Sequence, residues 1–218
     1  MARDVTQPAS EQAPLRMSYA EWQSWLGTAE MHRGEWVDGE VVAFAMPTYL
    51  HQAILLWLAR LLAEYVERRE LGQVGVDGAE MWLRSRNTAR LPDLFFVAIA
   101  NLGQLNAERR EGPADLVVEI ISNDSVTRDR REKFLEYQRA GIPEYWIIDP
   151  RPRRQSVDFY TLDADGYYQP VPPDDAGRLR SRVLPGFWID PGWLWQDPLP
   201  GPYQLIGRIE AEQADPLP

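Results

Sequence analysis

The strongest indication of the fold is the segment ADLVVEIISNDSVTRDRREKFLEYQRAGIPEYWIID, residues 114–149. Its first part is apolar on both alternating faces, which is typical of a strand covered on both sides. A helical segment over residues 125–140 follows and ends at Gly141 and Pro143. EYWIID predicts a second strand of the same kind. This order of elements favours an α/β domain whose mixed central β-sheet is flanked by helices.

The elements on either side complete one domain, which we place at residues 18–195. Residues 1–17 are interpreted as a disordered lead-in, and residues 196–218 as an irregular tail rich in proline and acidic residues. The remaining predicted elements are a short helix opened by the capping box at residues 18–21, a hairpin over 34–45 turning at Asp38-Gly39, a helix over 49–70, strands over 74–83 and 91–98, and a hairpin over 156–171.

Composition excludes several classes of function. The net charge is −10, so no global basic field draws the chain to nucleic acid, although a local basic groove stays compatible with it. The absence of cysteine excludes a disulfide scaffold, a cysteine-based zinc site and a cysteine nucleophile. No apolar run reaches the length of a membrane span, and we expect a cytoplasmic protein without a membrane partner. The basic residues are arginines apart from a single lysine, Lys133.

Two carboxylates in predicted strands suggest a metal site. Glu119 interrupts the apolar run VVEII, where it either pairs with an arginine or binds a metal ion. Asp93 begins the strand LFFV behind Pro92, and taken alone it is more simply a strand-entry residue. If the two strands pair, both carboxylates converge on one point and need a cation. With no cysteine and two histidines, such a site favours Mg²⁺ or Mn²⁺ over zinc.

Lys133 is the third candidate. At 100° per residue, it shares the apolar stripe of the helical segment with Phe134 and Tyr137, so it faces the sheet. A lysine stem whose ammonium reaches water is the simpler explanation. A chain that otherwise uses arginine keeps lysine at this inward position, which favours contact of a compact ammonium with a water or an oxyanion.

Further polar residues could support such a site. Two groups of arginines, Arg84, Arg86 and Arg90 and then Arg128, Arg130 and Arg131, could form a basic rim for a phosphodiester backbone, or simply a solvated surface. Glu40, just after the first hairpin turn, could supply a further metal oxygen. Glu35 and His51 complete the set, and His51 points inward at the start of its helix, where a structural role is favoured.

The ordered set RLPDLFFV, ADLVVEIIS, DRREKFLEY and GIPEYWIIDP resembles the Uma-two family of restriction-endonuclease-like proteins, within the PD-(D/E)XK nuclease superfamily. The similarity extends from about Glu35 to the segment LPGFWID. The resemblance implies a restriction-endonuclease-like core, with Asp93 as the aspartate of the Pro-Asp motif and Glu119 as the acid of the (D/E)XK motif. Ile121 stands where the superfamily has lysine, and Lys133 is expected to take over that role.

The resemblance implies a Mg²⁺- or Mn²⁺-dependent endonuclease that acts on DNA, without an organic cofactor, as a homodimer. Its catalytic residues would be Asp93, Glu119 and Lys133, and its metal ligands Asp93, Glu119 and Glu40. Two alternatives stay open at this point. One is a catalytically inactive nuclease fold that binds nucleic acid or protein. The other is a purely structural core of carboxylates and arginines.

Overall fold

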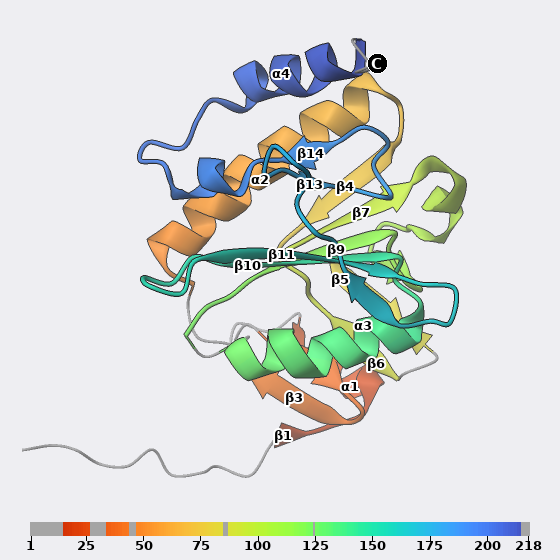
Figure 1. Cartoon of the computed structure of the whole chain (residues 1–218). Helices are drawn as coiled ribbons and strands as arrows, with labels where there is room; N and C mark the ends of the chain where they lie inside the picture. Colours follow the sequence, from red (N-terminus) through yellow and green to blue (C-terminus); the bar gives the residue numbers. More distant parts are fainter. Residues whose placement is uncertain (1–14, 27–33, 44–46, 85–86, 124, 215–218) are drawn as a thin grey trace, which may run out of the picture.

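The computed structural model describes residues 15–26, 34–43, 47–84, 87–123 and 125–214 (Figure 1). Its central sheet has six strands in the order β12-β11-β10-β9-β7-β4. The two middle strands, β9 and β10, are parallel, and the other neighbours are antiparallel, so the predicted mixed sheet is confirmed. The bounds are β12 (Tyr168–Pro170), β11 (Ser156–Leu162), β10 (Glu144–Asp149), β9 (Leu116–Ile120), β7 (Leu94–Ala98) and β4 (Gly72–Val76).

A second sheet of six strands has the order β1-β3-β2-β6-β5-β8, and two short strands, β13 and β14, pair near the C-terminus. Their bounds are β1 (Leu15–Arg16), β3 (Glu40–Ala43), β2 (Gly34–Val37), β6 (Thr88–Arg90), β5 (Glu80–Leu83), β8 (Arg109–Glu111), β13 (Leu179–Arg180) and β14 (Trp188–Ile189). The predicted first hairpin is β2–β3, and its turn has positive φ angles of 47° at Asp38 and 88° at Gly39.

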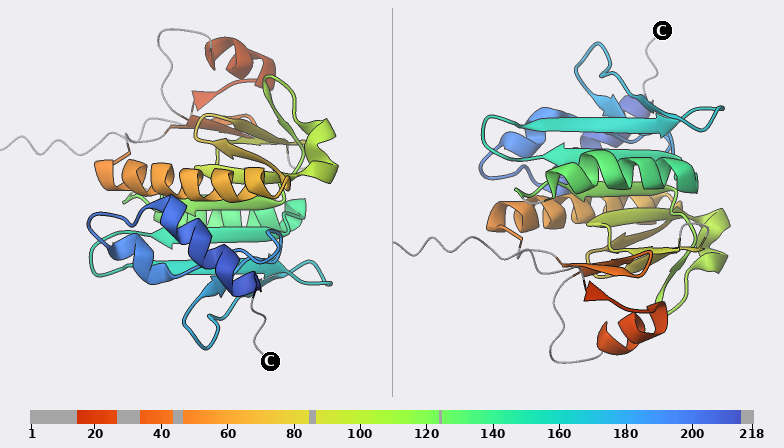
Figure 2. Two further views of the ribbon diagram at one scale, coloured as in Figure 1. Left: turned by 90° about the horizontal axis from the view of Figure 1, so that it is seen from above. Right: turned by 90° about the horizontal axis from the view of Figure 1, so that it is seen from below.

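Helices cover both faces of the central sheet. The α-helices of the described ranges are α1 (Tyr19–Leu26), α2 (Tyr49–Arg68), α3 (Phe134–Ala140) and α4 (Pro202–Ala214). Figures 1 and 2 show α2 and α4 on one face and α3 on the other, with the second sheet beyond α3. The two faces are filled by separate apolar clusters, one containing residues of α2 and α4 and the other containing Tyr137 of α3 and Met81 of β5. The site described below lies in the second of these layers.

The side chains of β9 alternate between the two layers, as its sequence predicts. Val118 and Ile120 pack in the cluster of α2, whereas Val117 and Ile121 pack in the cluster of α3. Glu119 therefore lies on the α3 face of the sheet, between two apolar neighbours. The pattern of the sequence places a carboxylate inside the layer that the helix covers.

The helical segment before β10 is less regular than the sequence suggests. Residues Arg128–Lys133 form a π-helix that continues into α3. Such widened turns are rare and are frequently found at functional sites. Both Asp129 and Lys133 are buried here, at 2% exposure each. The inward orientation predicted for Lys133 is confirmed, and Asp129 joins it.

Two expectations for elements differ from the structure. The predicted strand over residues 74–83 is two strands in different sheets, β4 and β5, because the chain turns at Asp77-Gly78, where Gly78 has a φ of 90°. The tail interpreted as irregular contains α4, whose Leu205, Ile206 and Ile209 are buried in the cluster of α2.

At the N-terminus, β1 pairs with β3, so residues 15–16 of the predicted lead-in are part of a sheet. Residues 1–14 lie outside the described chain. No helix in the described part of the chain has the length and apolar content that a membrane span requires.

Candidate active site

Asp93 and Glu119 face each other across two paired strands. The antiparallel register of β7 and β9 pairs Leu94 with Val118, so one step outward it sets Asp93 opposite Glu119. Directly opposed residues share a face of the sheet, with Cβ atoms about 5 Å apart. Asp93 Oδ2 accepts a hydrogen bond from the backbone N–H of Ile120 at 2.7 Å, which fixes its carboxylate at the end of the ladder. The predicted pairing of the two strands is thus confirmed, and its register places the two acids opposite each other.

Lys133 reaches Glu119 from the helical layer. Its Nζ lies 2.8 Å from Glu119 Oε1, and the hydroxyl of Tyr137 donates to the same oxygen at 2.8 Å. Lys133 and Tyr137 are one helical turn apart, which explains why both meet one carboxylate. The side chains of Lys133 and Glu119 are each 3% exposed, so this is a buried ion pair. The ammonium does not escape to water, contrary to the simpler explanation for this lysine.

Glu35 enters the same site from the second sheet. Its Oε1 lies 3.0 Å from Lys133 Nζ and accepts the backbone N–H of Leu91 at 2.9 Å. Its Oε2 accepts a hydrogen bond from Arg90 at 2.6 Å, and Arg90 also donates to Glu136. Glu35 is fully buried, and Arg90 is 1% exposed. Lys133 therefore bridges Glu35 and Glu119, and links the second sheet to the central sheet.

Asp129 is a further acid that the sequence did not single out. Its Oδ1 lies 3.7 Å from Lys133 Nζ and is a buried atom that accepts no hydrogen bond from the described residues. Asp129 lies four residues before Lys133, so the helical spacing already places the two side chains on one face, and the π-helix formed by Arg128–Lys133 keeps both of them buried. We call Glu35, Asp93, Glu119 and Asp129 the acidic cluster.

Three carboxyl groups of the acidic cluster have shifted pKa values. Burial raises the pKa of Glu119 to about 8, against the attraction of Lys133, and burial also raises the pKa of Asp129. Burial opposes ionisation of Glu35 too, but Lys133 and Arg90 overcome it and lower its pKa to about 2. Although burial disfavours its charge, Lys133 has a raised pKa because Glu119, Glu35 and Asp129 surround it. At neutral pH the carboxyl group of Glu119 is therefore partly protonated, while Lys133 stays an ammonium.

His51 lies beside Asp93 at the start of α2. Its Nε2 is 3.3 Å from Asp93 Oδ2, and its backbone N–H bonds to the N-cap residue Thr48 at 3.2 Å. His51 therefore points inward at the start of its helix, as predicted, and also contacts the carboxylate of Asp93. Through this contact, the start of α2 is joined to the end of the central sheet at which Asp93 and Glu119 lie.

Two other predicted site residues make their contacts elsewhere. The carboxylate of Glu40 pairs with Arg16 at the edge of the second sheet and is not among the groups that contact Lys133 or Glu119. Arg130 points to β11, where it bonds to Asp158 at 3.0 Å and to Ser156 at 2.9 Å. The structure thus brings neither residue to the acidic cluster.

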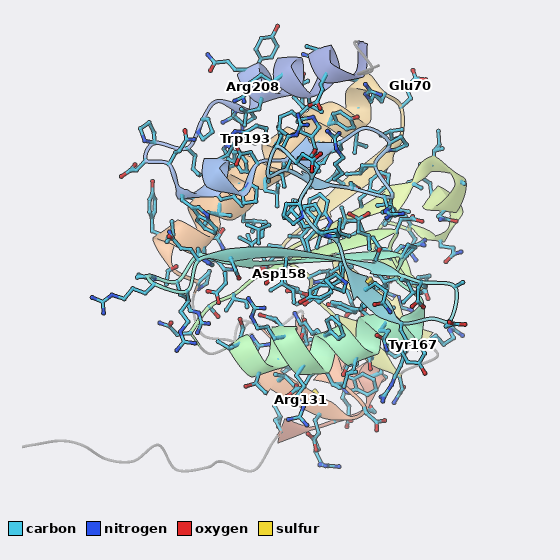
Figure 3. All side chains as sticks on the ribbon, in the orientation of Figure 1. Glu70, Arg131, Asp158, Tyr167, Trp193 and Arg208 are labelled. Carbon is cyan, nitrogen blue, oxygen red and sulfur yellow. The ribbon has the colours of Figure 1, made fainter. Side chains whose placement is uncertain are left out.

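Most of the described arginines of the predicted basic rim lie beside carboxylates. Arg90 is buried by its two carboxylates, Arg84 lies 3.9 Å from Glu111, and Arg86 falls outside the described residues. Arg128 is mostly covered and lies 3.9 Å from Asp129. Figure 3 shows Arg131 on the side of the helical segment that faces away from the central sheet.

The residues fit a hard divalent cation. Asp93 and Glu119 offer carboxylates on opposed residues of two paired strands, and Asp129 Oδ1 accepts no hydrogen bond from the described residues, so oxygen ligands for a cation are present. Within the described residues, no three acidic or histidine side chains stand ready to hold a metal. Mg²⁺ is usually held by one or two carboxylates with water and substrate phosphate, so a pair of carboxylates is sufficient.

Comparison with known proteins agrees with this arrangement. A solved structure titled "putative nuclease belonging to DUF820", from Anabaena variabilis, matches with a TM-score of 0.60 and 16% identity, over 74% of this chain and 89% of that chain. At this identity the likeness concerns the fold, which is that of a nuclease. The family model Uma2, described as "Putative restriction endonuclease", matches residues 18–192. The chain therefore belongs to the Uma2 family of restriction-endonuclease-like nucleases, as the resemblance predicted. No curated protein matches the chain.

Proposed function

We propose that this protein is a divalent-metal-dependent endonuclease that hydrolyses phosphodiester bonds in DNA. Asp93 and Glu119 hold Mg²⁺ or Mn²⁺, and Lys133 is the third catalytic residue. One observation carries the proposal: the register of β7 and β9 sets Asp93 opposite Glu119, and Lys133 Nζ lies 2.8 Å from Glu119. Family membership supports the same conclusion.

Each residue has a distinct task. The bound metal would supply Lewis acidity, by lowering the pKa of a water and neutralising charge at the phosphate. Asp93 is held by the N–H of Ile120, so its carboxylate is oriented before a metal binds. Lys133 remains protonated because three carboxylates raise its pKa, so it donates hydrogen bonds and does not act as a base. It therefore orients the attacking water and stabilises charge that develops on the phosphate oxygens.

The lysine position explains the departure from the superfamily motif. Ile121, which stands two residues after Glu119, is 1% exposed and packs in the cluster of α3. A lysine there would bury its stem in that layer, where Tyr137 and Lys133 already contact Glu119. The helical segment thus supplies an ammonium to the same carboxylate from within that layer. We propose that Lys133 performs the role of the motif lysine that is absent at position 121.

The proposal extends to the assembly. Because one site cuts one strand, we propose that the protein acts on duplex DNA as a homodimer, and that it does so in the cytoplasm. Equilibrium sedimentation of the full chain tests the dimer independently of activity, since a monomer at working concentration contradicts it.

The experiment is a cleavage assay on plasmid and linear DNA with Mg²⁺ or Mn²⁺. We expect cleavage by the wild type, and a loss of roughly 10²–10³ in rate for Asp93→Asn, Glu119→Gln and Lys133→Met. Glu40→Gln is the matched control, because Glu40 pairs with Arg16 away from the cluster, and it should keep full activity. Folded wild type that cleaves neither substrate contradicts the proposal and favours the inactive, binding form of the fold.

A further inference from the structure

A basic loop lies next to the candidate active site. The loop between β10 and β11, residues 150–155, carries Arg151, Arg153 and Arg154 in a chain whose net charge is −10. Arg151 pairs with Asp149 at 2.8 Å. Arg153 and Arg154 are exposed, and within the described part of the chain neither has a carboxylate partner. These two charges are therefore available to an external anion.

The strand register places this loop at the same end of the central sheet as Asp93 and Glu119. Ile147 of β10 pairs with Glu119 of β9, and Pro150 follows three residues later. At about 3.3 Å per residue, the loop begins roughly 10 Å beyond the level of Glu119. Figure 1 shows the β10–β11 turn and the start of α2 at the same end of the sheet. The loop is thus within a few nucleotides of the proposed reaction.

A cavity of about 480 Å³ opens between this loop and the start of α2. Its lining includes the rings of Tyr49 and Trp195 and the amides of Gln155 and Gln196, with Asp197 as the only charged residue among the lining residues. A lining without a cation does not fit a phosphate. Aromatic rings and amides fit the face and the edge of an uncharged nucleobase.

Tyr49 connects the cavity to the active site. It lies two residues before His51, whose Nε2 is 3.3 Å from Asp93, and its side chain is 89% exposed. An exposed tyrosine at a site that binds nucleic acid provides a stacking surface for a base. Its exposure also means that the fold does not depend on this ring.

We propose that the β10–β11 loop and the start of α2 bind a single-stranded stretch of nucleic acid. Arg153 and Arg154 contact phosphates, and the cavity lined by Tyr49 and Trp195 takes an unpaired base. This inference rests on the proposed function and adds the substrate surface to it. It implies that the strand approaching Glu119 is unpaired at the position next to the cut.

The test is the binding of fluorescent 12-nucleotide strands to the full chain, measured by anisotropy in EDTA across a series of salt concentrations. DNA and RNA strands of one sequence are compared, and the tighter of the two identifies the sugar. For single strands, each phosphate contact contributes about 0.7 to the slope of log K against log salt. We expect Arg153→Ala/Arg154→Ala to reduce the slope by about 1.4.

Stacking is tested by Tyr49→Ala, which should weaken binding at least about fivefold while the salt slope stays unchanged. On a strand of the same length that lacks its bases, wild type and Tyr49→Ala should bind equally. Tyr167→Ala is the matched control, because Tyr167 is 60% exposed at the other end of the sheet (Figure 3).

The charge control is Arg139→Ala/Arg182→Ala. Both arginines are exposed, and both lie toward the opposite end of the central sheet. Arg139 is at the end of α3, and Arg182 is beside Glu144 at the start of β10. This pair removes the same charge and should leave the slope unchanged. The inference is overturned if the loop variant and Tyr49→Ala both bind like wild type, or if the control pair weakens binding as much.

The two proposals fail separately. Metal-dependent cleavage together with unaltered strand binding by the loop variant would leave the nuclease standing and remove this surface. Loop-dependent strand binding by a protein that never cleaves would retain the surface and remove the proposed catalysis.

Discussion

Replacing Lys133 with methionine removes the charge that joins the two sheets. Methionine keeps most of the length of the stem but leaves Glu35, Glu119 and Asp129 without the ammonium that lies 3.0, 2.8 and 3.7 Å from them. Removing one partner of a buried ion pair typically costs about 3–5 kcal/mol of stability. The same substitution removes the donor that we assign to the attacking water.

The loss of stability in Lys133→Met should increase with pH. Without Lys133, the pKa of Glu119 rises further above its unfolded value, and the pKa of Glu35 rises from about 2. A carboxyl whose pKa is higher in the folded state destabilises the protein increasingly as pH rises above the unfolded pKa, by up to about 1.4 kcal/mol per pH unit. The loss relative to wild type is therefore smaller at pH 6 than at pH 8.

The assay is urea unfolding at both pH values, followed by tryptophan fluorescence and circular dichroism. Adding Glu119→Gln to Lys133→Met removes one of the stranded carboxylates, so the double variant should be more stable than the single variant at pH 8 but equally inactive. Lys133→Met that is as stable as wild type at pH 8 would refute the reasoning. So would a double variant no more stable than the single one. Recovery of activity in the double variant would refute the catalytic role of Lys133.

Three further predictions follow from the same contacts. Because Glu119 has a pKa of about 8, Mn²⁺ binding at pH 7 should release a proton, which calorimetry in buffers of different ionisation enthalpy detects; release of the same size from Glu119→Gln would contradict this. His51→Ala should weaken Mn²⁺ binding about 10–100-fold by freeing Asp93, and an unchanged affinity would assign His51 a purely structural role. Glu144→Gln should lower the free energy of unfolding by about 1–3 kcal/mol, since this buried carboxylate accepts hydrogen bonds from Trp146, Ser181 and two backbone N–H groups. The Glu144 variant should keep its Mn²⁺ affinity, and a matching loss would link the two ends of the sheet.

Hydrophobic periodicity made much of this site predictable. Alternation along β9 fixes the face of Glu119, and the helical stripe fixes the face of Lys133. The pairing of two buried strands then brings Asp93 to the same point. These features depend on local pattern and on one strand pair, which the sequence expresses directly.

Long-range pairing and local irregularity were not predictable in the same way. The burial of Arg90 requires Glu35, which is 55 residues away and is brought there by pairing of β2 with β6. Asp129 lies four residues before Lys133, so the 100° spacing places it on the inward side, whereas the widening of Arg128–Lys133 into a π-helix has no signal in that spacing. The arginines of the loop after β10 are visible in the sequence, but the position of that loop near Glu119 follows only from the parallel register of β9 and β10.

The most direct test of the central claim is calorimetric titration of Mn²⁺ into the wild type, Asp93→Asn and Glu119→Gln, with Glu40→Gln as the control and folding checked for each. We predict binding by the wild type and by Glu40→Gln, and loss of that binding in both site variants. Well-folded wild type that binds no Mn²⁺, or site variants that bind it as well as wild type, would contradict a metal site built on Asp93 and Glu119.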